Sequence, residues 1–151
     1  MNIEELKIKL VNLDASIIFE EVGENLNLNI EPARFKDFMQ MIFNDENLLF
    51  DYLFCVTCVD WKTHLTMVYH LESTKHRHII VVKSKLAREN PEIETVSDIW
   101  RTAEFHERES YDLFGVRFIN HPDLRRLFLT DDYVGWPLRK DFEDEVNLIK
   151  L

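Results

Sequence analysis

Residues 49–86 read L-F-D-Y-L-F-C-V-T-C-V-D-W-K-T-H-L-T-M-V-Y-H-L-E-S-T-K-H-R-H-I-I-V-V-K-S-K-L and contain three apolar-rich runs separated by short polar segments. The runs cover about residues 49–59, 65–72 and 77–86, lengths that are typical of strands or slightly above. The first run has apolar side chains on both faces of an extended chain, as in a central strand that is covered on much of both sides. The second run alternates apolar and polar residues, as a half-buried strand does. The stretch therefore predicts three consecutive strands, of which the first is central.

A helix and a β-hairpin are predicted upstream of these strands. Apolar residues at helical spacing indicate a short helix from Ile3 to about Asn12. Residues 16–22 and 25–30 flank a glycine and predict the two strands of a hairpin. The alternation in the second of these strands predicts that Asn27 and Asn29 face solvent.

A second helix is predicted from Pro32, because proline suits the first turn of a helix. Its apolar residues repeat at the spacing of one buried face: Phe35, Phe38, Met39, Ile42 and Phe43. The order helix, two strands, helix, three strands predicts an α+β fold, a two-layer domain in which helices pack on a mixed sheet. We expect the 151 residues to form a single domain whose α+β core covers residues 1–88.

A third helix is predicted to start near Ser97, which is a suitable N-cap residue. At 100° per residue its apolar side chains gather on one face, and Glu107 projects from the middle of that face. A carboxylate in such a place needs a basic or hydrogen-bonding partner. Arg108 lies on the flank, where Glu104 and Asp112 are spaced to hold its guanidinium. Gly115 is a natural C-terminal stop.

The stretch from Glu107 to Phe142 reads E-R-E-S-Y-D-L-F-G-V-R-F-I-N-H-P-D-L-R-R-L-F-L-T-D-D-Y-V-G-W-P-L-R-K-D-F, and it contains five of the nine arginines but one lysine. Arginine is preferred over lysine where a buried or bidentate contact with a carboxylate is needed. Two glycines and two prolines fix the path of the backbone in this stretch. The pattern is typical of an interface, so we expect residues 95–142 to form a helix and an extended arm that binds partners, followed by a short tail at 143–151.

Three blocks of this stretch, E-R-E-x-x-D-L-F-G-V, H-P-D-L-R-R and D-D-Y-x-G-x-P-L-R-K-D-F, resemble the signature of the 30 kDa subunit of respiratory complex I, which is the C subunit of bacterial NADH:quinone oxidoreductases. The resemblance implies a peripheral-arm subunit with an α+β core and no redox centre of its own. The signature positions, expected to bind partners or to hold the structure, are Glu107, Arg108, Glu109, Asp112, Phe114, Gly115, His121, Pro122, Asp123, Arg125, Arg126, Asp131, Asp132, Tyr133, Gly135, Pro137, Leu138, Arg139, Lys140, Asp141 and Phe142.

The resemblance also implies what surrounds the chain. Its partners would be the 49 kDa-type subunit and the neighbouring iron-sulfur subunits, and the iron-sulfur clusters, flavin and quinone would lie on those partners. The chain would act by positioning them, on the cytoplasmic side of the inner (plasma) membrane, and would touch the membrane only through the complex. The equivalent subunit of a membrane-bound hydrogenase, or of an F420H2- or ferredoxin-dependent dehydrogenase, is an alternative within the same family. We expect the arm to be required for assembly and dispensable for folding of the core.

Composition and local motifs argue against other classes of function. A formal charge of -10 disfavours nucleic acid as a partner. No apolar run approaches the roughly 20 residues of a spanning helix, and the N-terminus lacks the form of a secretory signal. A free-standing enzyme would need a site such as His106, Glu109 and Asp112, but this set lacks the spacing of a known acid/base or metal motif.

The other candidate ligands have simpler explanations. Cys55 and Cys58 lie in a predicted strand, where their spacing sends the side chains to opposite faces, so neither a redox pair nor a metal site is expected. His76 and His78 would share a strand face, yet no cysteine-histidine set accompanies them. His121 precedes a proline and is read either as a turn residue or as a partner contact.

Overall fold

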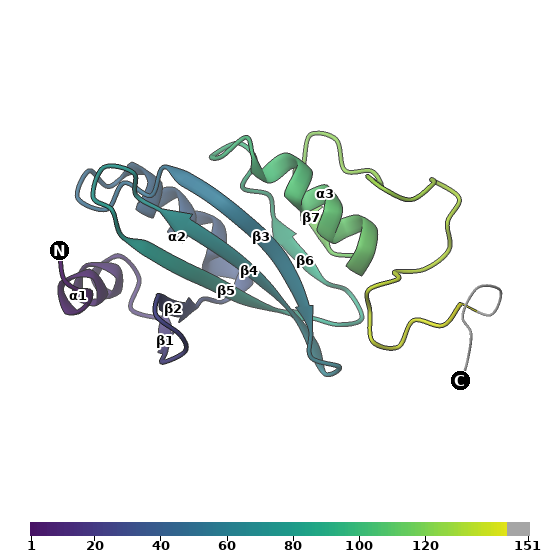
Figure 1. The fold of residues 1–151 in the computed structure, drawn as a ribbon, viewed down its shortest axis with the longest axis horizontal. Helices are drawn as coiled ribbons and strands as arrows, with labels where there is room; N and C mark the ends of the chain where they lie inside the picture. Colours follow the sequence, from purple (N-terminus) through teal and green to yellow (C-terminus); the bar gives the residue numbers. More distant parts are fainter. Residues whose placement is uncertain (145–151) are drawn as a thin grey trace.

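The computed structural model describes residues 1–144, which form three helices and seven strands (Figure 1). In chain order these are α1 (Ile3–Leu13), β1 (Ile18–Glu20), β2 (Leu26–Asn29), α2 (Pro32–Asn44), β3 (Tyr52–Asp60), β4 (His64–Glu72), β5 (Ile79–Ala87), β6 (Glu92–Glu94), α3 (Ala103–Phe114) and β7 (Arg117–Ile119). Most of the predicted tail, 143–151, lies outside the described residues. No helix within 1–144 combines the length and apolar character needed to cross a bilayer.

The main sheet has the strand order β1-β2-β5-β4-β3 and is mixed, because β2 pairs with β5 in parallel and the other neighbours are antiparallel. The predicted α+β class with a mixed sheet and the predicted hairpin of β1 and β2 are confirmed. The prediction that the first strand of the 49–86 stretch is central is wrong, since β3 lies at an edge of the sheet. Its second apolar face arises because the aromatic residues Tyr52 and Phe54 stay largely exposed.

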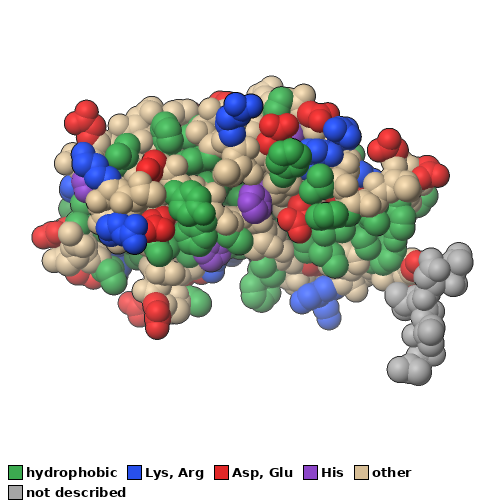
Figure 2. Space-filling model, turned by 45° about the horizontal axis from the view of Figure 1, so that its top comes forward, with side chains coloured by type: hydrophobic (Ala, Val, Ile, Leu, Met, Phe, Trp, Pro, Cys, Tyr) green, Lys and Arg blue, Asp and Glu red, His purple; other side chains and the backbone are tan. Residues whose placement is uncertain are grey.

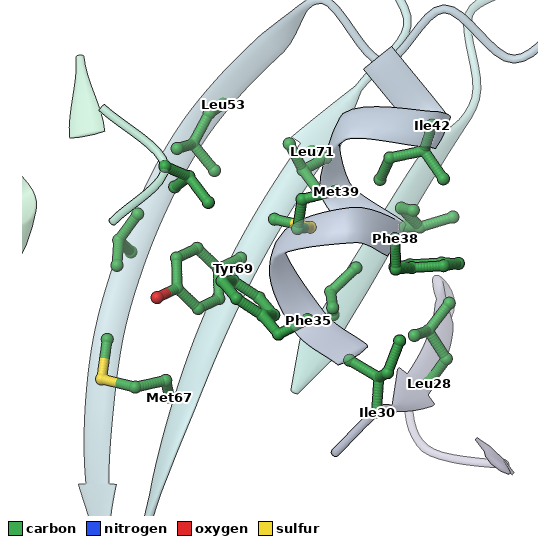
Figure 3. Packing of buried hydrophobic residues seen from close by; sticks show 14 of the residues in the cluster. Leu28, Ile30, Phe35, Phe38, Met39, Ile42, Leu53, Met67, Tyr69 and Leu71 are labelled. Carbon is green, nitrogen blue, oxygen red and sulfur yellow. The ribbon is translucent and has the colours of Figure 1, made fainter. Parts of the chain in front are cut away.

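Helix α2 packs on the sheet through four fully buried side chains, Phe35, Phe38, Met39 and Ile42. Figure 3 shows them facing Tyr69 and Leu71 of β4 and Leu28 of β2. The ring centroids of Phe35 and Tyr69 lie 4.8 Å apart. In Figure 1 the helix lies behind the sheet, and no helix crosses the front of β3, β4 and β5. The predicted layer of helix on sheet is thus formed on one face.

The two cysteines follow the prediction. Cys55 is opposite His70 and Cys58 is opposite Met67 in the β3–β4 pairing, with a register shift between Leu53 and Cys55. Met67 is buried in the core and His70 is not, so the two thiols point to opposite faces. Burial raises the pKa of the Cys58 thiol to about 12.

The asparagines of β2 do not both face solvent as predicted. Asn27 is buried, and its amide nitrogen donates to Val22 O at 2.9 Å and Asn25 O at 2.8 Å, which closes the hairpin loop. Asn29 is half-buried and donates to Glu20 on β1. The amides therefore stabilise the hairpin instead of meeting water.

Helix α3 starts at Ala103 and not near Ser97, so that prediction is wrong. Residues 96–100 form a separate turn, in which Trp100 N donates to Val96 O at 2.9 Å. Its indole nitrogen donates to Phe50 O, and Thr102 Oγ1 donates to Leu53 O, both beside the start of β3. The helix ends, as predicted, at Gly115 in the left-handed conformation (φ 77°).

A second, two-stranded sheet joins β6 and β7 in parallel on either side of α3. Ile93, Val96, Trp100, Ala103, Val116 and Phe118 belong to the same buried cluster as the residues of the main sheet and α2. The hydrophobic core therefore continues past residue 88 into the segment that carries the arm.

Candidate functional site: the anchored arm

The arm, residues 120–142, leaves β7 and runs without helix or strand past the end of α3 (Figure 1). Asp112, in the last turn of α3, is fully buried and holds the start of the arm. One carboxylate oxygen accepts the N–H groups of Leu127, Phe128 and Leu129 at 3.2, 2.7 and 3.1 Å. Burial alone would raise the pKa of Asp112, but these N–H groups and Arg126 lower it, so the carboxylate stays ionised.

Arg126 is the partner of Asp112 and the centre of the arm. Its side chain is 8% exposed, and Nη1 lies 3.1 Å from the second oxygen of Asp112. Nη2 donates to Tyr133 O and Gly135 O, each at 3.0 Å. Its guanidinium also lies 4.6 Å from the ring centroid of Trp136. One buried arginine thus ties α3 to two separate segments of the arm.

Arg108 is also buried, but its predicted hold by Glu104 and Asp112 is not what the structure shows. Its Nε donates to Arg125 O at 3.2 Å and its Nη2 donates to Arg126 O at 3.0 Å. Asp112 is already occupied by the arm. The guanidinium of Arg108 therefore satisfies backbone carbonyls of an irregular segment, which has no ladder of its own to do so.

Trp136 brings the arm across the end of α3. Its ring lies 5.5 Å from that of Tyr111, and a Cβ atom placed on Gly115 would lie 2.6 Å from it. The next link is backbone, from Leu138 N to Leu113 O at 3.0 Å. Gly115 is required here for its left-handed backbone and for the space that the indole takes.

The end of the arm is fixed to the sheet. Lys140 N donates to Asp60 Oδ2 at 2.8 Å, and Arg88 pairs with Asp60 and, at 2.9 Å, with Asp141. The Arg88 hydrogen bond is the main cause that lowers the pKa of Asp60. Arg139 Nε donates to Phe114 O at 2.7 Å. Asp60 and Arg88 were not among the residues singled out in the sequence, because a charge after a strand carries no local signal of a distant partner.

Glu107 is fully buried, as predicted, and its partners are hydrogen-bond donors. Val96 N donates to Oε1 at 2.8 Å, and Thr95 Oγ1 lies 2.6 Å from Oε2. Burial raises the pKa of Glu107 to about 7, although these donors act in the opposite direction. Glu107 thereby joins α3 to the end of β6.

The remaining signature residues lie on or near the surface. Exposed ones are Pro122, Asp123, Arg125, Asp131, Asp132, Leu138, Lys140 and Asp141, and partly buried ones are Glu109, Phe114, His121, Tyr133, Gly135, Pro137, Arg139 and Phe142. His121 serves as a turn residue, since Nε2 lies 3.0 Å from Glu104 O and Nδ1 accepts from Asp123 N. Arg125 forms an exposed pair with Asp123.

The candidate ligand clusters are not assembled in the described part of the chain, where no group of three His, Cys, Asp or Glu side chains could hold a metal ion. Of His106, Glu109 and Asp112, the last has its oxygens bound by the arm. The rings of His76 and His78 stack 5.7 Å apart, but in a turn before β5 and not on a strand. Each also contacts a backbone carbonyl, Glu46 O and Leu48 O respectively.

The polarity of the arm is inverted relative to an ordinary surface segment. The charged groups of Arg126 and Asp112 point inward, whereas Phe128, Val134 and Leu138 are 67%, 88% and 53% exposed. Phe105 on α3 adds a fourth exposed apolar side chain. Figure 2 shows hydrophobic side chains gathered at the end of the molecule where the arm lies. We call Phe105, Phe128, Val134 and Leu138 the arm patch.

An α+β domain with an arm folded around buried charges has close relatives of known structure. A chain in the membrane-bound sulfane sulfur reductase, an archaeal respiratory membrane complex, aligns with 93% of this chain and 85% of its own length at a TM-score of 0.79 and 26% identity. The trypsin-resistant fragment (1-134) of Nqo5 aligns over its full length and 82% of this chain, with a TM-score of 0.71 and 29% identity.

The chain belongs to the family described as respiratory-chain NADH dehydrogenase, 30 kDa subunit, whose profile matches residues 28–146. The C/D subunit of the NADH-quinone oxidoreductase of Phocaeicola vulgatus is 53% identical over 67% of this chain and 20% of that protein. The C subunit of the F420H2 dehydrogenase of Methanosarcina mazei is 45% identical over 64% of this chain and 63% of that protein. The aligned part of the chain spans between 20% and 42% of the length of the first five curated relatives it matches.

Proposed function

We propose that this chain is a peripheral subunit of an NADH:quinone oxidoreductase, and that it acts by positioning neighbouring subunits through its arm. The observation that carries the proposal is the inverted polarity of the arm. Buried charges give the segment a fixed shape, and the exposed apolar side chains of the arm patch are left to a partner. Family membership supplies the kind of complex.

The partners that fit best are the 49 kDa-type subunit and the iron-sulfur subunits beside it. A relative whose name joins the letters C and D resembles this chain over only 20% of its own length, which supports a close association with a D-type subunit. In this proposal the chain holds no flavin, cluster or quinone and has no active site of its own. It lies on the cytoplasmic side of the membrane and reaches the membrane through the complex.

The test compares the arm patch with equally exposed apolar residues elsewhere. Phe128→Asp with Val134→Asp is expected to abolish co-purification of the tagged chain with other oxidoreductase subunits from membranes, because charges would enter a desolvated contact. The matched control is Ile8→Asp with Val22→Asp, at positions 61% and 56% exposed on α1 and the β1–β2 loop. Normal assembly of the arm variant, or equal loss in the control, would refute the role of the arm patch.

A second candidate is the equivalent subunit of a related assembly with another electron donor. The similarity to an F420H2 dehydrogenase subunit and to a chain of a sulfane sulfur reductase complex favours it. Oxidation of NADH by the co-purified complex supports the first candidate. A complex that oxidises reduced F420 or ferredoxin, and not NADH, supports the second.

A further inference from the structure

Glu107 is a buried carboxyl without a cation in direct contact among the described residues, and three elements meet around it. From the turn after β6, Thr95 and Val96 donate to its oxygens. From β4, the Tyr69 hydroxyl is fully buried and has no hydrogen-bond partner in the described part of the chain. From α2, Lys36 reaches the far side of the same Thr95. A buried carboxylate needs charge compensation that this arrangement only partly supplies.

Lys36 stands between this carboxyl and the surface. Its Nζ donates to Thr95 O at 2.5 Å and pairs with Asp98, whose side chain is 62% exposed. Thr95 Oγ1 lies 2.6 Å from Glu107 Oε2, so the ammonium and the carboxyl are bound to the same residue from opposite sides. Lys36 itself is partly buried, with 25% of its side chain exposed. A change of rotamer on its flexible stem, with no movement of the backbone, brings the charge closer to Glu107.

We propose that Glu107, Thr95, Lys36 and Asp98 form a proton-controlled joint between α2 and α3. With a proton on Glu107, Lys36 stays on Asp98 at the surface. When Glu107 releases its proton to water, Lys36 turns inward toward the new carboxylate and its pair with Asp98 is broken. The Tyr69 hydroxyl then becomes a second donor to the carboxylate.

The charged and titratable groups around Glu107 set the range in which the joint works. Burial of Glu107 raises its pKa to about 7, with Lys36 lowering it and Asp98 raising it. Tyr69 has its own pKa raised by burial and by Glu107, so it stays neutral. Beyond Tyr69, burial also keeps the Cys58 thiol neutral. The joint therefore changes state near neutral pH, and it does so in the helix that carries Asp112 and Arg108, the anchors of the arm.

The test follows Glu107 and Lys36 by NMR in the full chain labelled with ¹³C in glutamate side chains and ¹⁵N in lysine side chains. We expect a Glu107 carboxyl midpoint near neutral pH and a change in the Lys36 ammonium signal with the same midpoint. Lys36→Gln removes the inward cation and should raise the Glu107 midpoint by roughly one pH unit, and Asp98→Asn frees Lys36 and should lower it. Lys7→Gln on α1, which removes a lysine paired with Glu4, is the control and should leave the midpoint unchanged.

Two results would overturn the joint. One is a Glu107 carboxyl that stays ionised from pH 5 to 8. The other is a midpoint that Asp98→Asn does not move, and because Asp98 is exposed, this variant keeps the test decisive even if Lys36→Gln fails to fold. Neither result bears on assembly of the complex, so the joint and the proposed function fail independently.

Discussion

Arg125 and Arg126 are adjacent in the sequence, but their substitution by alanine should have very different effects. Arg125 is 64% exposed and pairs with the exposed Asp123, a kind of contact that contributes about 0–1 kcal/mol. Arg126 is 8% exposed and pairs with Asp112, which is fully buried. Removing one partner of a buried pair leaves the other charge uncompensated and costs about 3–5 kcal/mol. Arg126→Ala should therefore release the arm, and Arg125→Ala should not.

Amide hydrogen exchange at Leu127, Phe128 and Leu129 measures this difference directly, because these three N–H groups are bound to Asp112. If they exchange through local opening of the arm, a loss of about 3–5 kcal/mol corresponds to a fall in protection of about 10² to 10⁴-fold. Amides of β4 and β5 report on the core in the same experiment. We expect their protection and the thermal unfolding of the core to change little, since the arm is expected to be dispensable for folding of the core.

The outcome separates three situations. A large loss of protection confined to residues 127–129 supports an arm that is anchored by Arg126 and is separate from the core. Equal effects of Arg125→Ala and Arg126→Ala would refute the distinction between the exposed and the buried pair. Global unfolding in Arg126→Ala would show that the arm is required for folding of the whole domain.

Three further substitutions or measurements test other parts of the structure. Gly115→Ala should be more destabilising than Gly23→Ala in urea unfolding: both glycines have positive φ, costing about 1–2 kcal/mol for alanine, but only at Gly115 would the new Cβ meet the Trp136 ring, and equal effects would contradict the packing. In the native protein at pH 8, a thiol reagent should modify Cys55 before Cys58, whose pKa is raised by burial, and equal rates would show that β3 opens readily. The folded-state pKa of Asp60 is lowered by Arg88, so its stabilising effect is complete above the ordinary pKa of an aspartate and is lost as pH falls below it; Asp60→Asn should therefore flatten the fall in unfolding free energy between about pH 5 and 2, and an unchanged slope would disprove the link.

The sequence was most informative where a periodic pattern and a buried face coincide. Phe35, Phe38, Met39 and Ile42 could be assigned to one face of a helix because all four contribute to the core. The burial of Glu107 followed from the same angular argument, which held even though the start of the helix was misplaced. Apolar residues at helical spacing also occur in the turn at 96–100, and hydrogen bonds from Trp100 and Thr102 to β3 give that turn a path that local pattern does not predict.

The less predictable features depend on contacts between residues far apart in the chain. The interface character of the arm was expected from its arginines, but which arginine is buried was not, because Arg125 and Arg126 have the same chemistry and the same neighbours in sequence. The short strands β6 and β7 have three residues each and no clear alternation, so local pattern does not distinguish them from loop and arm. The edge position of β3 depends on the strand order, which hydrophobic pattern alone does not determine.

The parallel pairing of β2 with β5 sets an order for folding on the ribosome. The β1–β2 hairpin leaves the exit tunnel early, yet Leu26 pairs with Ile80 on β5, which is synthesised much later. A two-stranded hairpin is marginally stable by itself in water, so the nascent chain has to wait for β3, β4 and β5 to form their antiparallel meander before the hairpin can join its edge. The arm is translated last and finds Asp60 and Arg88 already placed at the end of that meander. Translation thus delivers the anchors before the segment that binds them.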